Sequence, residues 1–256
     1  MADPILVARK NRIAILTINR PERRNAFDLA TAEAIYKAFK QFDADYTLDV
    51  AVLTGAGGNF GAGADLHALA QGEKRPFLTD GDFAPMGCTR LKLSKPVIAA
   101  VEGYAVAGGI EVACWCDLRV AAKSATFGVF CRRFGVPLID LGTIRLPRLI
   151  GHSRAMDLIL TGRPVPADEA LAIGLANRVV EDGKALAAAL EIAEQLSAFP
   201  QTCMRGDRNS AIAQWDLDWD AAAKNEMENG LKAVRRGETL AGASRFSGGA
   251  GRHGQF

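Results

Sequence analysis

The 256-residue sequence contains no apolar run long enough to span a bilayer, and neither sign of charge dominates it. Its 31 Lys and Arg residues nearly balance 29 Asp and Glu residues, and the basic residues form no single run. That distribution argues against a protein that binds polyanions through charge alone. The segment from Met1 to Arg9 lacks a basic stretch followed by an apolar one, so we expect a cytoplasmic location.

Cysteine and histidine are scarce, which bears on disulfides and metals. The five cysteines are odd in number and irregular in spacing, so we expect reduced thiols and no disulfide framework. The three histidines are scattered, whereas a structural zinc site needs four ligands at short spacings. We therefore expect no metal. These residues are Cys88, Cys114, Cys116, Cys131, Cys203, His67, His152 and His253.

Short apolar strands alternate with amphipathic helices over most of the chain. Two β-rich runs, residues 5–7 and 13–18, flank a turn-like segment and predict a hairpin. Asp28 or Thr31 is expected to cap a helix that ends near Phe42. Alternation of this kind predicts an α/β core. Further strands are expected at residues 50–54, 96–101 and 118–121, and helices at residues 153–160 and 167–172.

From about Lys184 the chain becomes Ala-rich and helical, with no strong strand signal. We therefore divide it into a core of residues 1–190 and a C-terminal helical region of residues 191–256. Residues 71–87 mix Gly, Pro, Asp and Arg with little periodicity and predict a mobile loop. The Gly-rich tail, residues 247–256, is expected to be loosely held.

The glycine-rich segment from Gly55 to Gly63 fits neither common nucleotide motif. A phosphate loop ends in Gly-Lys-Ser/Thr, whereas Gly63 is followed by Ala64 and Asp65. A dinucleotide fingerprint that starts at Gly55 requires glycine where Phe60 stands. Two interpretations remain, a flexible loop or a backbone that approaches a ligand closely.

Glu111 follows Gly108 and Gly109 in an otherwise apolar segment. The two glycines either allow close packing of a strand on a helix or present a bare N–H to a developing negative charge. A carboxylate among apolar neighbours is costly unless it is paired or used. Glu111 is therefore a candidate acid or base, and the alternative is a partly exposed glutamate at a helix start, where the helix dipole stabilises it.

Asp140 is also acidic within an apolar run. It is either a turn or capping residue near Gly142 or a second working carboxylate. Glu111 and Asp140 suit acid–base chemistry only if the fold brings them together. A third candidate, Cys131, needs an activating base to act as a nucleophile, and the sequence offers no obvious one.

Three blocks of the sequence, taken together, resemble the crotonase superfamily, the enoyl-CoA hydratase/isomerase family. They are residues 59–66, residues 95–111 and the stretch from Gly142 to Val180, and they occur in the family's order. The resemblance covers roughly residues 5–185. The set carries the resemblance, because no single block is specific enough.

The resemblance implies an acyl-CoA site. The N–H groups of Ala64 and Gly108 would form an oxyanion hole, and each donor is worth about 3 kcal/mol in a transition state. Glu111 matches the first catalytic glutamate of the hydratases. Coenzyme A is part of the substrate, so no cofactor is expected. The positions that match the loops around CoA are Arg24, Ala26, Ala62, Asp65 and Leu66.

One position departs from the family pattern. Cys131 stands where hydratases carry their second catalytic glutamate, and Asp140 stands where dienoyl-CoA isomerases use an aspartate. The expected function is an enoyl-CoA hydratase-type lyase in which Glu111 is the main acid/base and Asp140 assists. The alternatives are an enoyl- or dienoyl-CoA isomerase that uses the same pair, and a non-catalytic acyl-CoA or RNA binder. The retained Glu111 and the lack of a basic run count against the binder.

The resemblance also implies a mixed α/β (α+β) fold, a crotonase spiral of ββα units with two roughly perpendicular sheets. The C-terminal helical region would drive assembly into a homotrimer, or a hexamer as a dimer of trimers. The expected partners are an acyl-CoA thioester and further copies of the chain, with no membrane or nucleic acid. Acyl specificity is expected to lie in residues 71–93 and near the C-terminal helices.

Overall fold

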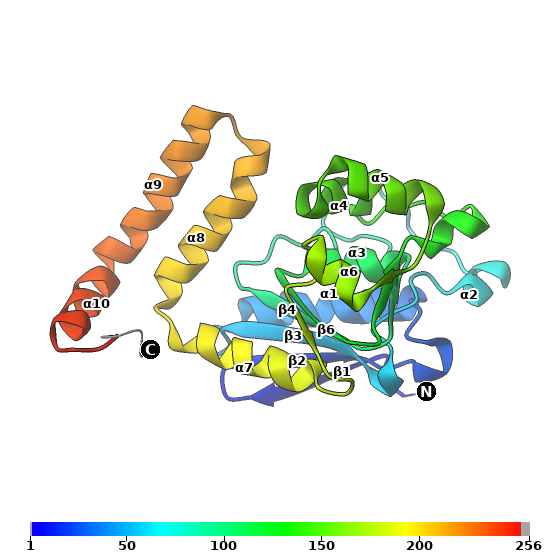
Figure 1. The fold of residues 1–256 in the computed structure, drawn as a ribbon, viewed down its shortest axis with the longest axis horizontal. Coiled ribbons are helices and arrows are strands. Elements are labelled where there is room, and N and C mark those ends of the chain that lie inside the picture. Colours follow the sequence, from blue (N-terminus) through cyan, green and yellow to red (C-terminus); the bar gives the residue numbers. More distant parts are fainter. Residues whose placement is uncertain (1, 252–256) are drawn as a thin grey trace. The chain divides into compact units, whose positions relative to one another are not determined.

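The computed structural model describes residues 2–251, and its chain begins with the predicted hairpin. Strands β1 (Ile5–Lys10) and β2 (Ile13–Ile18) pair antiparallel, with Ile5 opposite Ile18. Asn11 in the turn has a φ of 53°, a left-handed conformation that Asn tolerates better than most residues. The hairpin forms one edge of the larger of two sheets (Figure 1).

The larger sheet has six strands in the order β1-β2-β3-β4-β6-β9, and every pair from β2 onward is parallel. A smaller sheet has the order β5-β7-β8, and β5 runs parallel to β7. The predicted strands at residues 50–54, 96–101 and 118–121 are confirmed as β3, β4 and β6. The remaining bounds are β3 (Val50–Gly55), β4 (Val97–Val101), β5 (Tyr104–Val106), β6 (Leu118–Ala122), β7 (Thr126–Gly128), β8 (Val165–Pro166) and β9 (Arg178–Val180).

Helices cover both faces of the larger sheet. Alternate residues of a strand point to opposite faces, so both faces present apolar side chains for helices to bury. On one face, Val50 and Val52 pack in a cluster with Ala185, Ala189 and Ala193 of α7. The other face packs in a cluster that takes in α1, α3 and the helices beyond them. The helices of this part are α1 (Leu29–Ala44), α2 (Leu66–Ala70), α3 (Gly108–Trp115), α4 (Gly142–Ile150), α5 (His152–Thr161), α6 (Ala167–Ala172) and α7 (Ala185–Ala198).

Helix α1 begins where the capping residue predicts. The Asp28 side chain accepts a hydrogen bond from the Thr31 N–H at 2.8 Å, which satisfies one of the free donors of the first turn. Helix α4 was not predicted, because Pro147 lies inside it and proline usually ends a helix. It lies beside α5, beyond α3 (Figure 1).

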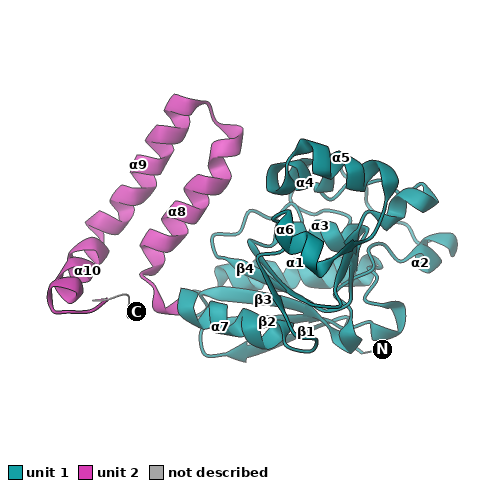
Figure 2. Ribbon diagram, in the orientation of Figure 1, with its two compact units in different colours: residues 1–196 teal, residues 197–256 magenta. Residues whose placement is uncertain are grey.

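The chain divides into two compact units, residues 1–196 and residues 197–256 (Figure 2). The expected boundary at residue 190 falls inside α7, and the oligomerising role of the C-terminal region stays a prediction. The tail is described only to residue 251, so the prediction for residues 252–256 lies outside the described residues. The second unit contains α8 (Gln201–Ala213), α9 (Trp219–Arg235) and α10 (Glu238–Ser247).

Residues 71–96 form no helix or strand, apart from an isolated bridge between Ala84 and Gly87. Within residues 2–251, no helix is both long enough and apolar enough to cross a bilayer.

Candidate active site

A cavity of about 550 Å³ lies in the first unit, a size typical of sites for small molecules. Glu111, Asp140, Cys131 and Arg75 contribute polar side chains to its lining. Most of the other side chains around it are apolar, so a ligand there leaves water for a largely apolar surface. The apolar lining residues are Leu66, Leu69, Phe77, Pro85, Met86, Phe130, Phe134, Val136, Pro137 and Ile139.

Glu111 lies in α3 with only 2% of its surface exposed. Its Oε1 accepts hydrogen bonds from the N–H of Asp140 at 2.9 Å and the N–H of Gly142 at 2.8 Å. A Cβ at Gly142 would lie 2.7 Å from that same oxygen, so any side chain there would force Glu111 to shift. Oε2 accepts no hydrogen bond from the described residues, which leaves it available to a ligand in the cavity.

Asp140 is equally buried and is held by different groups. Its Oδ1 accepts from the Met86 N–H at 2.9 Å and from the Thr89 hydroxyl at 2.6 Å. Arg145 donates to the main-chain oxygens of Asp140 and Thr89, at 3.2 and 2.7 Å. The next residue, Leu141, adopts the left-handed conformation with φ of 69°. That turn aims both the Asp140 and Gly142 N–H groups at Glu111.

The cavity raises the pKa of both carboxyl groups. Burial is the main cause for Glu111, the charge of Asp140 adds to it, and the pKa rises to about 8. Burial also raises the pKa of Asp140, but its hydrogen bonds from Thr89 and Met86 oppose the rise. At neutral pH the pKa of about 8 favours a proton on Glu111. Perturbed carboxyl pairs of this kind are characteristic of acid–base sites.

The segments that carry Ala64 and Gly108 pack against each other at the cavity wall. A Cβ at Gly108 would lie 3.3 Å from the Cα of Gly63, and a Cβ at Gly63 would lie 2.6 Å from the Gly108 nitrogen. Neither the Ala64 N–H nor the Gly108 N–H donates a hydrogen bond to any described residue. Both residues line the cavity, so two unpaired donors are available to an oxygen there.

Ala107 sets the direction of the Gly108 N–H. Its φ of 54° and ψ of −126° are strained for a residue with a Cβ. The strain turns the chain from β5 into α3, whose N-terminus begins at Gly108. No role for Ala107 was predicted, because strain of this kind leaves no local sequence signal. The glycine-rich loop packs closely against the start of α3, since a Cβ at Gly109 would lie 2.1 Å from the oxygen of Gly61. Its close approach to a ligand stays a prediction.

The five expected CoA-binding residues separate into two groups. Ala62 and Leu66 line the cavity, whereas Arg24, Ala26 and Asp65 do not. The backbone of Arg24 adopts the left-handed conformation, and its guanidinium lies 5.6 Å from the centre of the Tyr104 ring.

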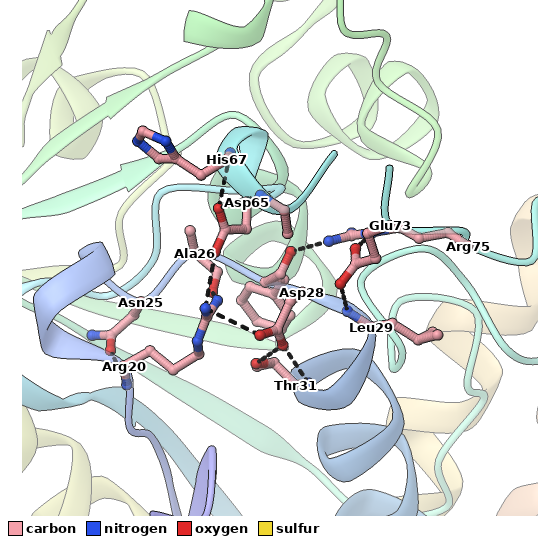
Figure 3. Close-up of polar contacts among 12 residues, drawn as sticks. Arg20, Asn25, Ala26, Asp28, Leu29, Thr31, Asp65, His67, Glu73 and Arg75 are labelled. Carbon is pink, nitrogen blue, oxygen red and sulfur yellow. Dashed lines mark hydrogen bonds and ion pairs between the residues drawn. The ribbon is translucent and has the colours of Figure 1, made fainter. Parts of the chain in front are cut away.

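The Asp65 carboxylate is occupied by the protein itself. It accepts from the N–H groups of His67 and Ala68 at the start of α2 and pairs with Arg20 at 2.9 Å (Figure 3). Arg20 also donates to the main-chain oxygen of Ala26 at 2.5 Å. Its main-chain N–H also donates to the Phe27 oxygen at 2.8 Å, and its carbonyl oxygen accepts from the Leu69 N–H at 3.1 Å, so a role for Asp65 in CoA binding stays a prediction.

Cys131 lines the cavity from a short 3-10 helix, Phe130–Phe134. Burial raises the pKa of its thiol, and the charge of Glu111 adds to the rise. The thiol is therefore protonated and weakly nucleophilic at neutral pH. Within residues 2–251, no group of three or more His, Cys, Asp or Glu side chains is placed to hold a metal ion.

No role was predicted for Arg75, Thr89 or Arg145. The structure places Thr89 and Arg145 against Asp140, and Arg75 in the cavity wall. These three residues lie far from Glu111 in the sequence, so only the tertiary fold reveals their proximity.

The sequence profile of the family described as "Enoyl-CoA hydratase/isomerase" matches residues 8–244. The chain belongs to this family. The predicted resemblance, the crotonase fold class and the assignment as an enzyme are thereby confirmed.

Curated relatives cover nearly the whole chain. Enoyl-CoA hydratase EchA19 of Mycobacterium tuberculosis is 36% identical over 246 residues, which are 94% of this chain and 92% of the relative. Carnitinyl-CoA dehydratase of Salmonella typhi is 36% identical over 243 residues, 93% of this chain and 88% of the relative.

Solved structures match equally well. Enoyl-CoA hydratase EchA1 from Mycobacterium marinum has a TM-score of 0.89 and 36% identity, covering 96% of each chain. An enoyl-CoA hydratase from Mycobacterium tuberculosis H37Rv has a TM-score of 0.87 and 38% identity, covering 95% of this chain and 96% of the other.

Proposed function

We propose that the protein is an enoyl-CoA hydratase-type lyase in which Glu111 is the main acid/base and Asp140 assists. One observation carries the proposal: the free Oε2 of Glu111 belongs to the same cavity wall as the two unpaired N–H groups of Ala64 and Gly108. Two fixed donors stabilise an enolate oxygen, and a nearby carboxyl group moves the proton.

In the proposed hydration, the thioester oxygen accepts hydrogen bonds from the Ala64 and Gly108 N–H groups. The ionised Asp140 takes a proton from water as the water oxygen bonds to the β-carbon. The electrons of the double bond move toward the thioester oxygen, and the enolate then takes a proton at the α-carbon from Glu111. Transfer of the proton from Asp140 to Glu111, directly or through water, restores the starting protonation states, so one water is added in total, and the reverse sequence removes it. The raised pKa of Glu111 supports its role as the acid.

The relatives' names support water chemistry over double-bond migration. One relative is named a hydratase and another a dehydratase. An isomerase remains the second candidate, because Cys131 occupies the expected place of the second hydratase glutamate and lines the cavity. A non-catalytic acyl-CoA or RNA binder is the third.

Product analysis separates these candidates. Purified protein is incubated with short, medium and aromatic 2-enoyl-CoAs, and the products are examined by mass spectrometry. A gain of one water that is lost in Glu111→Gln supports the hydratase. An unchanged mass with a moved double bond makes it an isomerase, and binding without any product makes it a binder.

We also propose that the protein is a homotrimer or a hexamer. Helices α8 to α10 and their connections leave large apolar side chains exposed within the isolated chain, which favours burial against further copies. Light scattering coupled to size exclusion tests this, and a monomer at micromolar concentration would contradict it. The exposed residues are Ile212, Trp215, Leu217, Trp219, Met227, Val234, Leu240 and Phe246.

All five cysteines are free thiols, and thiols stay reduced in the cytosol, so the proposed location is cytoplasmic. The proposed reaction needs no cofactor beyond the CoA of the substrate.

A further inference from the structure

Thr89 lies next to Asp140 with 0% of its surface exposed. Its Oγ1 donates a hydrogen bond to Oδ1 of Asp140 at 2.6 Å, although the two residues are 51 positions apart in the chain. A buried hydroxyl costs free energy unless it is hydrogen-bonded, and a valine would fill much the same space without that cost. The presence of the hydroxyl is therefore best explained by what it does at Asp140.

A fixed turn of the main chain carries Thr89. Ala84 and Gly87 exchange two main-chain hydrogen bonds, at 3.2 and 2.7 Å. Gly87 has a φ of 76°, and a Cβ there would lie 2.1 Å from the oxygen of Ala32 in α1. The turn therefore packs directly against α1, and Thr89 follows it closely in the chain. Its hydroxyl reaches Asp140 from a rigid support.

Arg145 of α4 connects the same two residues through their main chains. Its guanidinium donates to the Thr89 oxygen at 2.7 Å and to the Asp140 oxygen at 3.2 Å. With the hydroxyl bond, these contacts close a ring of three residues. Displacing any one of the three disturbs two hydrogen bonds, so the ring fixes Thr89 and Asp140 relative to each other.

The two carboxylate oxygens of Asp140 have different environments. Oδ1 accepts hydrogen bonds from Thr89 and from the Met86 N–H. Oδ2 accepts none from the described residues, and they do not seal it off from solvent. Asp140 lines the cavity, so Oδ2 is the oxygen that a water there can reach. Two donors on Oδ1 keep the carboxylate from turning and exchanging its oxygens.

We propose that Thr89 is a positioning residue for hydration: its hydroxyl holds Oδ1 of Asp140, so that Oδ2 stays ionised and aimed at the water that is added. The proposal deepens the proposed function and rests on its choice of Asp140 as the base. A donor to a carboxylate favours the charged form, and the base must be charged to take the proton. Thr89 itself does not line the cavity, so it acts only through Asp140.

The pKa of Asp140 agrees with this role. Burial raises this pKa, and the hydrogen bond from Thr89 is the largest of the effects that oppose the rise. Removing the hydroxyl should therefore raise the pKa further. A substitution of Thr89 leaves the other titratable and charged groups around Asp140 in place. Those groups are Glu111 of α3, Cys88, Arg90 and Arg145.

The pH dependence of hydration tests the proposal. In Thr89→Val, kcat/KM for the best 2-enoyl-CoA is expected to fall about tenfold near pH 7, because a hydrogen bond to a charged group is lost. The acid side of the profile, where Asp140 gains a proton, should move to higher pH. The decline near pH 8 belongs to Glu111 and should stay. Thr89→Ser keeps a donor and should restore both the rate and the profile.

Thr54→Val is the matched control. Thr54 is also buried, but its hydroxyl donates to the main-chain oxygen of Ala100 at 3.1 Å, so this variant should keep the profile of the unaltered protein. An acid side that does not move in Thr89→Val would overturn the proposal, as would a rate that Thr89→Ser fails to restore. Should Thr89→Val not fold, Thr89→Ala removes the same donor from a smaller side chain and is judged in the same way.

Thermal unfolding separates failure of this proposal from failure of the proposed function, because it needs no turnover. The pKa of Asp140 in the fold lies above its ordinary value, so stability is lost as pH rises through that pKa. The higher pKa expected in Thr89→Val extends this loss, so its Tm deficit should be larger near pH 7 than near pH 4. If no 2-enoyl-CoA is hydrated, the proposed function falls. A deficit that widens then still supports the hold of Thr89 on Asp140, whereas an equal deficit at both pH values overturns it.

Discussion

The main-chain N–H of Asp140 donates a hydrogen bond to the side-chain Oε1 of Glu111 at 2.9 Å, so one proposed catalytic residue positions the other. Asp140 is in turn fixed through its own carboxylate by Met86 and Thr89. Both carboxyl groups therefore keep one oxygen bound to the protein and one oxygen free of described partners. This arrangement holds two acids close together without a direct bond between their side chains.

Glu111→Gln is expected to lower turnover of the best 2-enoyl-CoA by about 10²–10⁴-fold, the usual contribution of a general acid or base. Glutamine retains an oxygen that can accept from the Asp140 and Gly142 N–H groups, so affinity for saturated acyl-CoA should change little. Steady-state kinetics and calorimetry measure the two effects. The exposed Glu33→Gln is the matched control and should behave as the unaltered protein. Full turnover in Glu111→Gln would remove Glu111 from the mechanism.

The same substitution is expected to stabilise the protein at alkaline pH. The pKa of Glu111 rises from an ordinary 4.5 to about 8 in the fold, so the folded state holds a proton that the unfolded state releases between these values. The free energy of unfolding therefore falls as pH rises through this window. Glutamine has no proton to lose. Thermal unfolding should show little difference near pH 4, at the acid end of the window, and a higher Tm for Glu111→Gln by several degrees near pH 9.

An equal Tm difference at both pH values would contradict the raised pKa. It would show that glutamine changes packing and not the proton balance of the site.

Asp140→Asn is expected to move the pH dependence of catalysis. The negative charge of Asp140 helps to raise the pKa of Glu111, so its removal should lower that pKa toward the ordinary value. In the unaltered protein, kcat/KM for hydration should decline as pH rises through about 8. The residual activity of Asp140→Asn should decline at lower pH. An inflection that stays in place would mean that another group titrates.

Gly142→Ala is expected to reduce kcat by at least about tenfold, because the new Cβ would meet the Glu111 carboxyl group at 2.7 Å and displace it. Gly230→Ala is the matched control, since its Cβ would meet no atom within 4 Å in α9. That control should keep full activity and gain up to about 1 kcal/mol of helix stability. Equal activity in the two variants would argue against positioning of Glu111 by this contact.

Cys131→Glu is expected to raise the hydration rate about tenfold or more, because it restores a carboxyl group where the hydratases carry one. Cys131→Gln has the same size without the ionisable group and should not share the gain. Mass spectrometry of the products reports hydration and isomerisation together. Equal effects of glutamate and glutamine would mean that volume, not acid–base chemistry, matters at this position.

Local patterns were enough to predict several elements. The hairpin, the cap at Asp28 and the strands β3, β4 and β6 follow from apolar periodicity and capping chemistry, which act over a few residues. Helix α4 was missed because it contains Pro147, and proline usually ends a helix. Packing overrides that local rule here. Short strands such as β5 and β9 were missed because three residues carry too little periodicity.

The sequence by itself determined the family, the α/β core and the identity of the two carboxylates, since these depend on residue types in a fixed order. Only the tertiary structure decided that Glu111 meets Asp140, that Thr89 and Arg145 hold it, and that Arg75 faces the same cavity. The physical reason is distance along the chain: Asp140 is separated from Glu111 by 29 positions and from Thr89 by 51. Contacts over such separations depend on how the strands and helices pack, and no local pattern records them.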